Sequence, residues 1–242
     1  MNYTEFQQIF CDLCAKNSIP TPTDEQIEQF YRFTEHLIEV NAITNLTAIR
    51  EIPEIIAKHY VDSLLASPHI PKNARVLDIG CGPGFPSIPL AITRPDLQIT
   101  SLDSTQKKIN FVLDCKELLS LANLNPVSAR AEDHDFMKKI GAFDVVVSRA
   151  VARMTILTEL ALPYVKIGGF MLAMKGARAD EELFAAENAI KTLGGGAPTM
   201  VKCALTPPTG DPEERAFIII PKKSHSPAVY PRPFAAIKKK EL

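Results

Sequence analysis

The sequence lacks three features, each of which would place it in a particular class of protein. It contains no apolar run near the roughly 18 residues that a membrane-spanning helix needs, and it shows no signal-peptide pattern. Its five cysteines, an odd number, are scattered without the spacing of a disulfide framework. We therefore expect a cytoplasmic protein that works in a reducing compartment and away from membranes.

A positive net charge is also missing. The 27 Lys and Arg residues are balanced by 28 Asp and Glu residues, for a formal charge of −1. This balance argues against a uniformly basic nucleic-acid binder, although a local basic patch remains compatible with it. Cys11 and Cys14 stand in Cys-x-x-Cys spacing, but they have no second pair and lie on an amphipathic pattern. We interpret them as core residues and predict no metal site.

The chain of 242 residues is long enough to bury a substantial core. Thr23 and Gln26 have capping-box spacing ahead of a helical apolar stripe that contains Ile27, Phe30 and Leu37. A further helix is indicated between Ile52 and Tyr60. We predict a helical N-terminal subdomain over residues 1–66, a larger domain over 67–221 and a basic C-terminal tail over 222–242.

From residue 73 onward, apolar runs typical of strands alternate with helical patterns, which predicts an α/β fold with a mostly parallel, seven-stranded sheet. The expected strands are Arg75–Ile79, Gln98–Leu102, Pro126–Ala129, Phe143–Ser148, Phe170–Met174, Thr199–Ala204 and Ala216–Ile220. The expected helices are Ser87–Thr93, Thr105–Leu121, Ala152–Tyr164 and Asp180–Leu193.

A glycine-rich turn follows the first expected strand, where Gly80, Gly82 and Gly84 alternate with other residues. Glycine permits the unusual backbone angles of a tight turn and the close approach of a ligand. Phe85 occupies the place of the third glycine of the dinucleotide fingerprint, so nicotinamide or flavin binding fits poorly. The turn resembles the first motif of class I S-adenosylmethionine-dependent methyltransferases, which have a Rossmann-like fold. Asp103, at the end of the next strand, resembles their ribose-binding acid; alternatively, the glycines form only a turn and Asp103 only a helix cap.

In such sheets the ligand binds at the carboxyl ends of the strands. Arg149 and Lys175 lie there, and we expect them to bind the cofactor carboxylate or the substrate nucleotide. Alternatively, each is a surface charge in a salt bridge. Asp62 lies three residues after His59, so that the two side chains can meet across one helical turn. Either His59 is a core histidine satisfied by that carboxylate, or this helix end borders the mouth of the cofactor site.

Several motifs in order carry a more specific resemblance, namely Asn45–Thr47, His59–Ser63, Asp78–Pro86, Leu102–Ser104, Ser148–Ala150, Met174–Gly176 and Tyr230–Arg232. Together they resemble the ribosomal small-subunit RNA guanine-N7 methyltransferase G family, also called glucose-inhibited division protein B, over nearly the whole chain. The resemblance implies methyl transfer to a guanosine of 16S ribosomal RNA near the decoding region, with naked RNA or the 30S particle as partner, by a monomer. It also implies that Gly80, Phe85, Ala131, Glu132 and Arg149 contact S-adenosylmethionine. Asp103 is added to this set because of the resemblance to class I methyltransferases in general.

Guanine N7 has a free lone pair and no proton to remove, so its methylation needs no general base. Catalysis can rest on proximity, orientation and electrostatics, and we accordingly assign no catalytic acid or base. Enzymes that methylate amino groups carry a Pro-Pro-aromatic segment after the fourth strand, where this chain has Ser148-Arg149-Ala150-Val151. Enzymes that methylate cytosine C5 need a cysteine nucleophile near the same end of the sheet, and no cysteine of this chain is suitably placed. The alternatives are a methyltransferase for another RNA or a small molecule, or a binding module without activity.

The last 21 residues concentrate positive charge, because six cations face only Glu241: Lys222, Lys223, Arg232, Lys238, Lys239 and Lys240. Prolines 227, 231 and 233 favour an extended, poorly packed segment. The tail either contacts RNA or is only solvated; in the second case Lys107, Lys108 and Lys175 would carry RNA binding. All the expected cofactor groups precede Pro221, so we predict that a chain ending there still binds S-adenosylmethionine normally.

Overall fold

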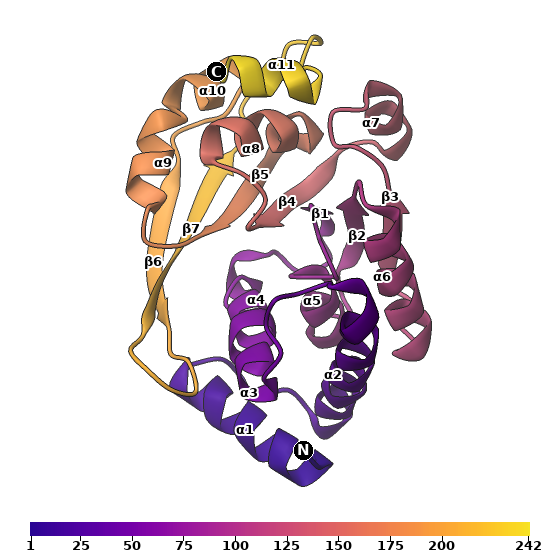
Figure 1. Ribbon diagram of the computed structural model, residues 1–242. Helices are drawn as coiled ribbons and strands as arrows, with labels where there is room; N and C mark the ends of the chain where they lie inside the picture. Colours follow the sequence, from indigo (N-terminus) through magenta and orange to yellow (C-terminus); the bar gives the residue numbers. More distant parts are fainter.

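A seven-stranded sheet runs through the middle of the molecule, which is described for residues 1–242 by a computed structural model (Figure 1). The strand order is β3-β2-β1-β4-β5-β7-β6. The first five strands are parallel, whereas β7 runs antiparallel to both β5 and β6. The strands are β1 Arg75–Ile79, β2 Gln98–Asp103, β3 Leu124–Ser128, β4 Phe143–Arg149, β5 Val165–Lys175, β6 Thr199–Leu205 and β7 Glu213–Pro221. The predicted α/β fold with a mostly parallel, seven-stranded sheet is confirmed.

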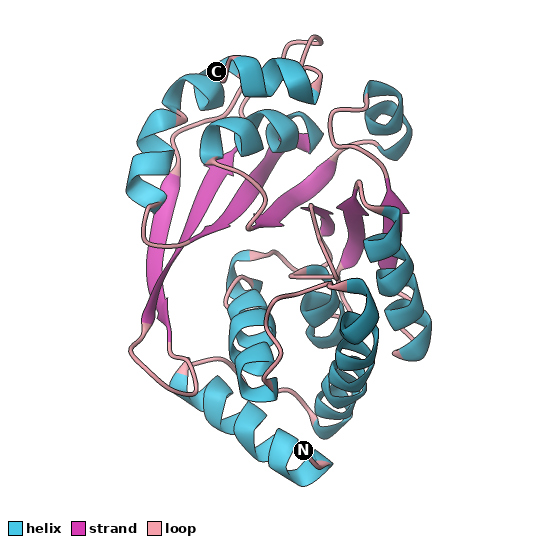
Figure 2. Cartoon of the chain, viewed as in Figure 1, coloured by secondary structure: helices cyan, strands magenta, loops and turns pink.

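Helices cover both faces of the sheet, with α1–α6 on one side and α7–α11 on the other (Figures 1 and 2). The first group is α1 Tyr3–Lys16, α2 Asp24–Thr44, α3 Ile52–Ile55, α4 Asp62–Leu64, α5 Ser87–Thr93 and α6 Gln106–Leu118, with the π-helix η1 Ile56–Val61 and the 3-10 helix η2 Ser67–His69. The second group is α7 His134–Ile140, α8 Met154–Ala161, α9 Ala179–Ala185, α10 Glu187–Thr192 and α11 Phe234–Lys239, with the 3-10 helix η3 Leu162–Tyr164. No helix is both long enough and apolar enough to cross a membrane.

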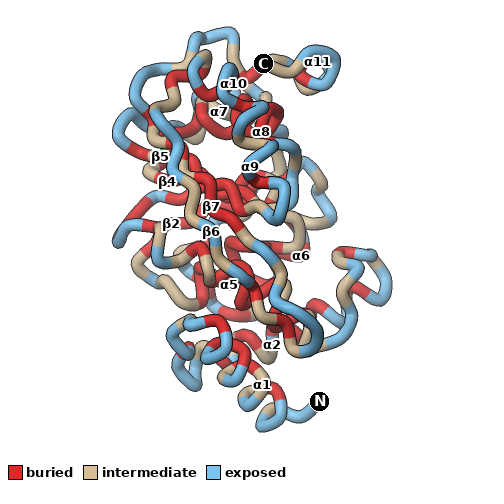
Figure 3. The backbone as a smooth tube through the Cα atoms, turned by 90° about the vertical axis from the view of Figure 1, so that its left-hand side faces the viewer, coloured by how far each residue is buried: buried red, intermediate tan, exposed pale blue.

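The N-terminal helices pack directly under the sheet. The predicted capping box of α2 is present, because Thr23 and Gln26 each bond to the other's backbone N–H. Phe33 on α2 contacts Tyr60 of η1 and Phe85 of the glycine turn, with ring centroids 5.5 and 5.6 Å apart. These rings belong to a single cluster of 40 buried residues that also takes in the lower face of the sheet (Figure 3). The N-terminal helices therefore hold the glycine turn from below.

Several elements differ from the sequence-based expectation. The expected helix Asp180–Leu193 is two helices, α9 and α10, and α7 was not predicted. β5 begins at Val165, five residues before the expected start, because it continues past Gly168 and Gly169. β3 begins at Leu124 and includes Pro126, which is possible because β3 lies at the edge of the sheet.

The C-terminal segment is packed against the domain, so the prediction of an extended, poorly packed tail was wrong. Residues 234–239 form α11, in which the Ile237 side chain is fully buried against Ile156 and Leu160 of α8. The Lys222 side chain is also buried, and it donates hydrogen bonds to Leu193 O and Ser226 Oγ. The prolines shape this segment, but its apolar side chains and backbone partners fix it in place.

Candidate functional site

The glycine turn connects β1 to α5 by a path that only small residues can follow. Gly80, Gly82 and Gly84 have φ angles of +72°, +57° and +96°, a region that side chains disfavour. A Cβ added to Gly80 would lie 2.3 Å from Val151 Cγ2, whereas a Cβ added to Gly82 would meet nothing within 4 Å. The turn therefore packs tightly on one side and presents open space on the other.

Asp103, at the end of β2, ties this turn to the neighbouring strand. Its Oδ2 accepts a hydrogen bond from the Gly82 N–H at 3.1 Å, and its Oδ1 accepts one from the Thr105 N–H at 2.8 Å. Lys108 Nζ lies 3.6 Å from Oδ2. A carboxylate has about four lone-pair sites, so these contacts leave capacity for ligand hydroxyls. The carboxylate therefore joins the glycine turn to the residue before α6 and still lines the cavity described next.

A cavity of about 370 Å³, the glycine-loop cavity, opens beside Gly80 and Asp103. The segment after β3 forms its opposite wall through Ala131 and Glu132. Tyr164 fixes that wall, because its hydroxyl donates to Ala131 O at 2.8 Å. The remaining lining residues are Ile79, Leu102, Ser104, Thr105, Lys108, Ala129, Arg130, Ala150, Val151, Leu160 and Phe234.

A second cavity of about 630 Å³, the arginine cavity, lies on the other side of Ala150 and Val151, which line both. Two carboxylates line it, Asp62 and Glu182. Six cationic side chains line it, namely Lys58, Arg149, Arg153, Lys175, Arg178 and Arg215. Its remaining lining residues are Ile49, His59, Ala152, Met174, Gly176 and Phe217. Five of the six cations form ion pairs, with Asp62, Glu182 or carboxylates outside the lining, and Arg178 forms none.

Arg149, the last residue of β4, is the centre of the arginine cavity. Its guanidinium donates to Lys58 O at 2.6 Å, to Asp62 Oδ2 at 2.9 Å and to His59 Nδ1 at 3.2 Å. Asp62 also accepts from Arg215 Nε at 2.7 Å. Two arginines take the Asp62 oxygens, so of the two alternatives for His59 the structure does not show a histidine satisfied by that carboxylate. Arg149 Nε is buried without a partner.

His59 is held in one protonation state. Burial and the neighbouring Arg149 lower the pKa of His59 to about 3, so the ring is neutral near pH 7. A guanidinium only donates, so Nδ1 must accept from Arg149 and the ring proton must be on Nε2. Nε2 then donates to Thr47 Oγ1 at 2.8 Å. The ring also stacks on Phe85, with centroids 4.3 Å apart, and so links the glycine turn to Arg149.

Asp78 in β1 stabilises the turn from inside the core. Its carboxylate is fully buried, and Oδ2 accepts from the Ser87 N–H at 3.2 Å at the start of α5. Burial raises the pKa of Asp78 to about 7. Asp78 lines neither cavity, so its role is to fix the distance between β1 and α5.

The site residues predicted from the sequence divide between the linings of the two cavities. Gly80, Asp103, Ala131 and Glu132 line the glycine-loop cavity, as does Lys108. His59, Asp62, Arg149 and Lys175 line the arginine cavity. Phe85 lines neither cavity and is buried beneath His59. Gly82 and Gly84 shape the turn without lining the cavity.

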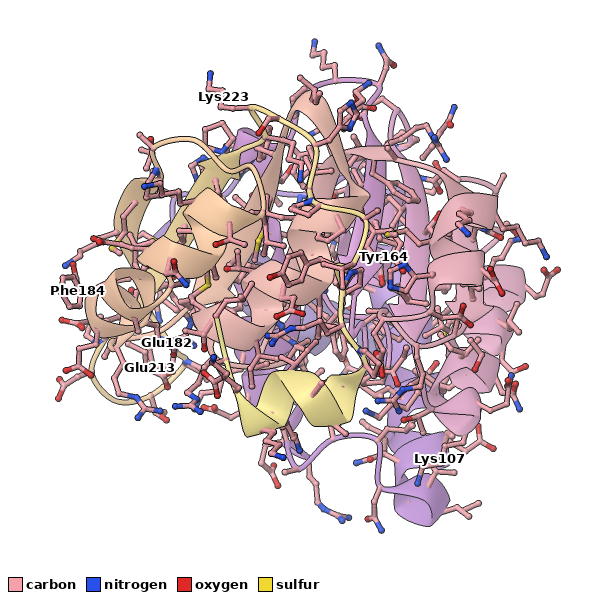
Figure 4. All side chains as sticks on the ribbon, turned by 90° about the horizontal axis from the view of Figure 1, so that it is seen from above. Lys107, Tyr164, Glu182, Phe184, Glu213 and Lys223 are labelled. Carbon is pink, nitrogen blue, oxygen red and sulfur yellow. The ribbon has the colours of Figure 1, made fainter.

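The remaining basic candidates have protein partners. Lys175 donates to Ala152 O and to Glu182 Oε2, at 2.6 and 2.7 Å. Lys107 donates to Thr44 O at 3.2 Å, and Arg232 forms an ion pair with Glu159. Seen from above, Lys107 and Glu182 lie on opposite sides of α11 (Figure 4). Sequence reasoning missed Lys58, Arg215 and Phe234 as lining residues, because no motif marks them.

The strand order, the glycine turn and the acid at the end of β2 define a class I S-adenosylmethionine-dependent methyltransferase. Among solved structures, the chain is similar to an O-methyltransferase from Bacillus cereus in complex with S-adenosylhomocysteine. The two are 15% identical, with a TM-score of 0.57 over 91% of this chain and 100% of that one, a likeness that concerns the fold alone.

The family follows from the sequence comparisons. Residues 26–209 match the profile of rRNA small subunit methyltransferase G. The ribosomal RNA small subunit methyltransferase G of Lactobacillus delbrueckii subsp. bulgaricus is 39% identical over 97% of this chain and 99% of its own length. That of Streptococcus sanguinis is 43% identical over 93% of this chain and 94% of its own. The chain belongs to this family of methyltransferases.

Proposed function

We propose that this protein transfers a methyl group from S-adenosylmethionine to N7 of a guanosine in small-subunit (16S) ribosomal RNA near the decoding region. The observation that carries this proposal is the pair of cavities that share Ala150 and Val151 as a common wall. One cavity fits an adenosine-containing donor and the other fits a nucleotide. The two reactants would therefore meet at the end of β4.

The residues of the glycine-loop cavity fit S-adenosylmethionine. Asp103 offers acceptors to the ribose hydroxyls, and the open side of Gly82 leaves room for the chain that joins the ribose to the methionine end. Ala131 and Leu160 supply apolar surface for the base. When bound, S-adenosylmethionine supplies a methyl group activated by the positive charge on its sulfur.

The residues of the arginine cavity would bind and orient the guanosine. Arg149 is fixed by Asp62, His59 and the Lys58 carbonyl, so that its guanidinium is held in one orientation. Preorganised donors of this kind cost no reorganisation when the reaction occurs. Since the neutral His59 has both nitrogens engaged, it positions Arg149 and moves no proton. The attacking N7 needs no base, so orientation of the nucleotide is sufficient.

Further lysines extend the positive surface beyond the cavity. Lys238, Lys239 and Lys240 are exposed on and just after α11, and none of them has an ion-pair partner. We propose that they contact RNA phosphates together with Lys107, which is exposed at the start of α6. We also propose that the protein acts in the cytoplasm as a monomer, and that residues 1–66, 67–221 and 222–242 are its three functional parts.

The test is methylation of ribosomal RNA by the purified protein. Small subunits and naked 16S RNA from a strain that lacks the gene are incubated with S-adenosylmethionine carrying a labelled methyl group. We expect the label in 7-methylguanosine when the nucleosides are resolved by mass spectrometry. Label in a methylated adenine amine, or none in either RNA, would contradict the proposal, and a comparison of the two RNAs identifies the substrate form.

A further inference from the structure

The last residues of the chain cross α8 and reach the glycine-loop cavity. Phe234, the first residue of α11, lines the cavity beside Leu160 and is partly exposed. Arg130, from the opposite wall, places its guanidinium carbon 5.5 Å from the centre of the Phe234 ring. Phe234 lies 13 residues beyond Pro221, in the part of the chain where we expected no cofactor group.

A buried ion pair fixes Phe234 in this place. The Glu159 side chain on α8 is fully buried, and its Oε1 and Oε2 accept from Arg232 Nε at 2.8 Å and Nη2 at 2.6 Å. The Arg232 backbone N–H donates to Oε1 at 2.9 Å as well. A buried carboxylate needs its counter-ion, and removing one partner of such a pair is strongly unfavourable. Arg232 is therefore an anchor, two residues ahead of Phe234.

Contacts on both sides of Phe234 complete the attachment. His134 Nε2 lies 2.8 Å from Pro231 O, and Ile237 packs against Ile156 and Leu160. Glu241 pairs with Arg153 and Thr155 on α8. We use the term C-terminal clasp for residues 230–242. Figure 4 looks down on the face that carries α8 and α11, with the helix of the clasp in yellow.

We infer that the C-terminal clasp is part of the cofactor site, where the Phe234 ring stacks on the adenine of S-adenosylmethionine. This inference rests on the proposed function. The glycine turn and Asp103 form one end of the cavity, where the donor's methionine and ribose fit, so the base must lie toward Ala131, Leu160 and Phe234. That end offers apolar surface and the Phe234 ring, whose centre also lies 5.0 Å from Lys238 Nζ. Apolar and aromatic groups are those that bind a flat base.

Calorimetry with S-adenosylmethionine and S-adenosylhomocysteine tests the inference directly. Stacking of a base on an aromatic side chain contributes about 1–3 kcal/mol, so Phe234→Ala should raise the Kd about 5-fold or more for both ligands. Phe184→Ala is the matched control, because Phe184 is 76% exposed on α9 and lines neither cavity. An unchanged Kd in a folded Phe234→Ala protein would overturn the inference.

A fluorescence experiment tests contact with the base itself. The sequence contains no tryptophan, so Phe234→Trp introduces the single indole of the protein. S-Adenosylhomocysteine and free adenosine should both quench its emission, methionine should not, and Phe184→Trp should respond to none of them. If calorimetry shows that Phe234→Trp binds S-adenosylhomocysteine while the emission is unchanged, the ring does not touch the adenine.

The two proposals fail in different ways. If the wild-type protein binds S-adenosylmethionine and methylates RNA while the Phe234 variants bind it equally well, only the role of the clasp is wrong. If the wild-type protein does not bind S-adenosylmethionine in calorimetry, both the proposed function and the proposed role of Phe234 are contradicted.

Discussion

Four of the 15 residues that line the glycine-loop cavity are charged, whereas eight of the 16 that line the arginine cavity are charged, and these come from separate segments. The glycine turn and Asp103 lie close together in the chain and belong to adjacent strands. Arg215 and Asp62, in contrast, are 153 residues apart and meet only through the fold. The glycine turn and Asp103 are thus built locally, whereas the arginine cavity, like the place of Phe234 in the glycine-loop cavity, depends on contacts between distant parts of the chain.

The largest expected effect comes from a branched side chain on the glycine turn. Gly82→Val extends from the turn into open space beside Asp103, where we expect the ligand to approach, so binding of S-adenosylmethionine should become undetectable in calorimetry. The matched control is Gly210→Val, since Gly210 also has a positive φ and an added Cβ there meets nothing within 4 Å, in the loop between β6 and β7. Tight binding by a folded Gly82→Val protein would show that the cofactor does not approach this turn.

Arg149→Ala should reduce rRNA methylation without weakening the binding of S-adenosylmethionine. We expect rRNA methylation to fall by about 100-fold or more, because a misplaced substrate is enough to cause such a loss. The Kd for S-adenosylmethionine should stay within about 3-fold of wild type, because Arg149 does not line the glycine-loop cavity and this difference is below about 1 kcal/mol. Circular dichroism checks the fold, in which Arg215 still pairs with Asp62. A large loss of cofactor affinity instead would place Arg149 on the cofactor.

Asp103→Asn should have a smaller effect, confined to the cofactor. The amide keeps one acceptor for the Gly82 or Thr105 N–H but loses the charge. Loss of a charge-assisted hydrogen bond costs about 1–3 kcal/mol, so the Kd for S-adenosylmethionine should rise about 10-fold. RNA affinity measured without cofactor should not change. If the cofactor Kd is also unchanged, Asp103 serves only to join the glycine turn to the residue before α6.

The pH dependence of stability should report on the arginine cavity. The pKa of His59 falls from an unfolded value near 6.5 to about 3 on folding. Its contribution to stability is therefore complete above pH 6.5 and is lost as the pH falls toward 3. Between pH 7 and pH 5 the free energy of unfolding of His59→Gln should decrease by about 2 kcal/mol less than that of wild type. The control is His225→Gln, at an exposed position; equal slopes for all three proteins would show that His59 is not buried as a neutral ring.

The smallest expected effect concerns the lysines of α11. Replacing Lys238, Lys239 and Lys240 with glutamine should weaken RNA binding a few-fold at low salt. It should also reduce the slope of log K against log salt by about 0.7 for each phosphate that the variant no longer neutralises. The double variant of Lys239 and Lys240 should leave cofactor affinity unchanged, since neither lines the glycine-loop cavity, whereas Lys238 Nζ lies 5.0 Å from the centre of the Phe234 ring. An unchanged salt slope would show that these lysines do not contact RNA.

The sequence was sufficient for the features that depend on local patterns. Alternating apolar runs predicted all seven strands, and the glycine spacing predicted the turn with positive φ angles. The partners of Asp62 could not be predicted, because its carboxylate, at the start of α4 directly after η1, bonds to Arg149 of β4 and Arg215 of β7 rather than to His59 one turn earlier. The position of Phe234 could not be predicted either, because it depends on the pairing of Arg232 with Glu159, 73 residues earlier in the chain. Local composition indicates a basic tail but does not show what that tail packs against.

A crystal structure with S-adenosylhomocysteine and 7-methylguanosine monophosphate would test the separation of the two cavities most directly. We predict that S-adenosylhomocysteine occupies the glycine-loop cavity, with its ribose on Asp103. The guanine should occupy the arginine cavity, and its methylated N7 should face the sulfur beside Ala150 and Val151. Binding of both ligands in one cavity, or binding of S-adenosylhomocysteine against Arg149 and Arg215, would contradict this account.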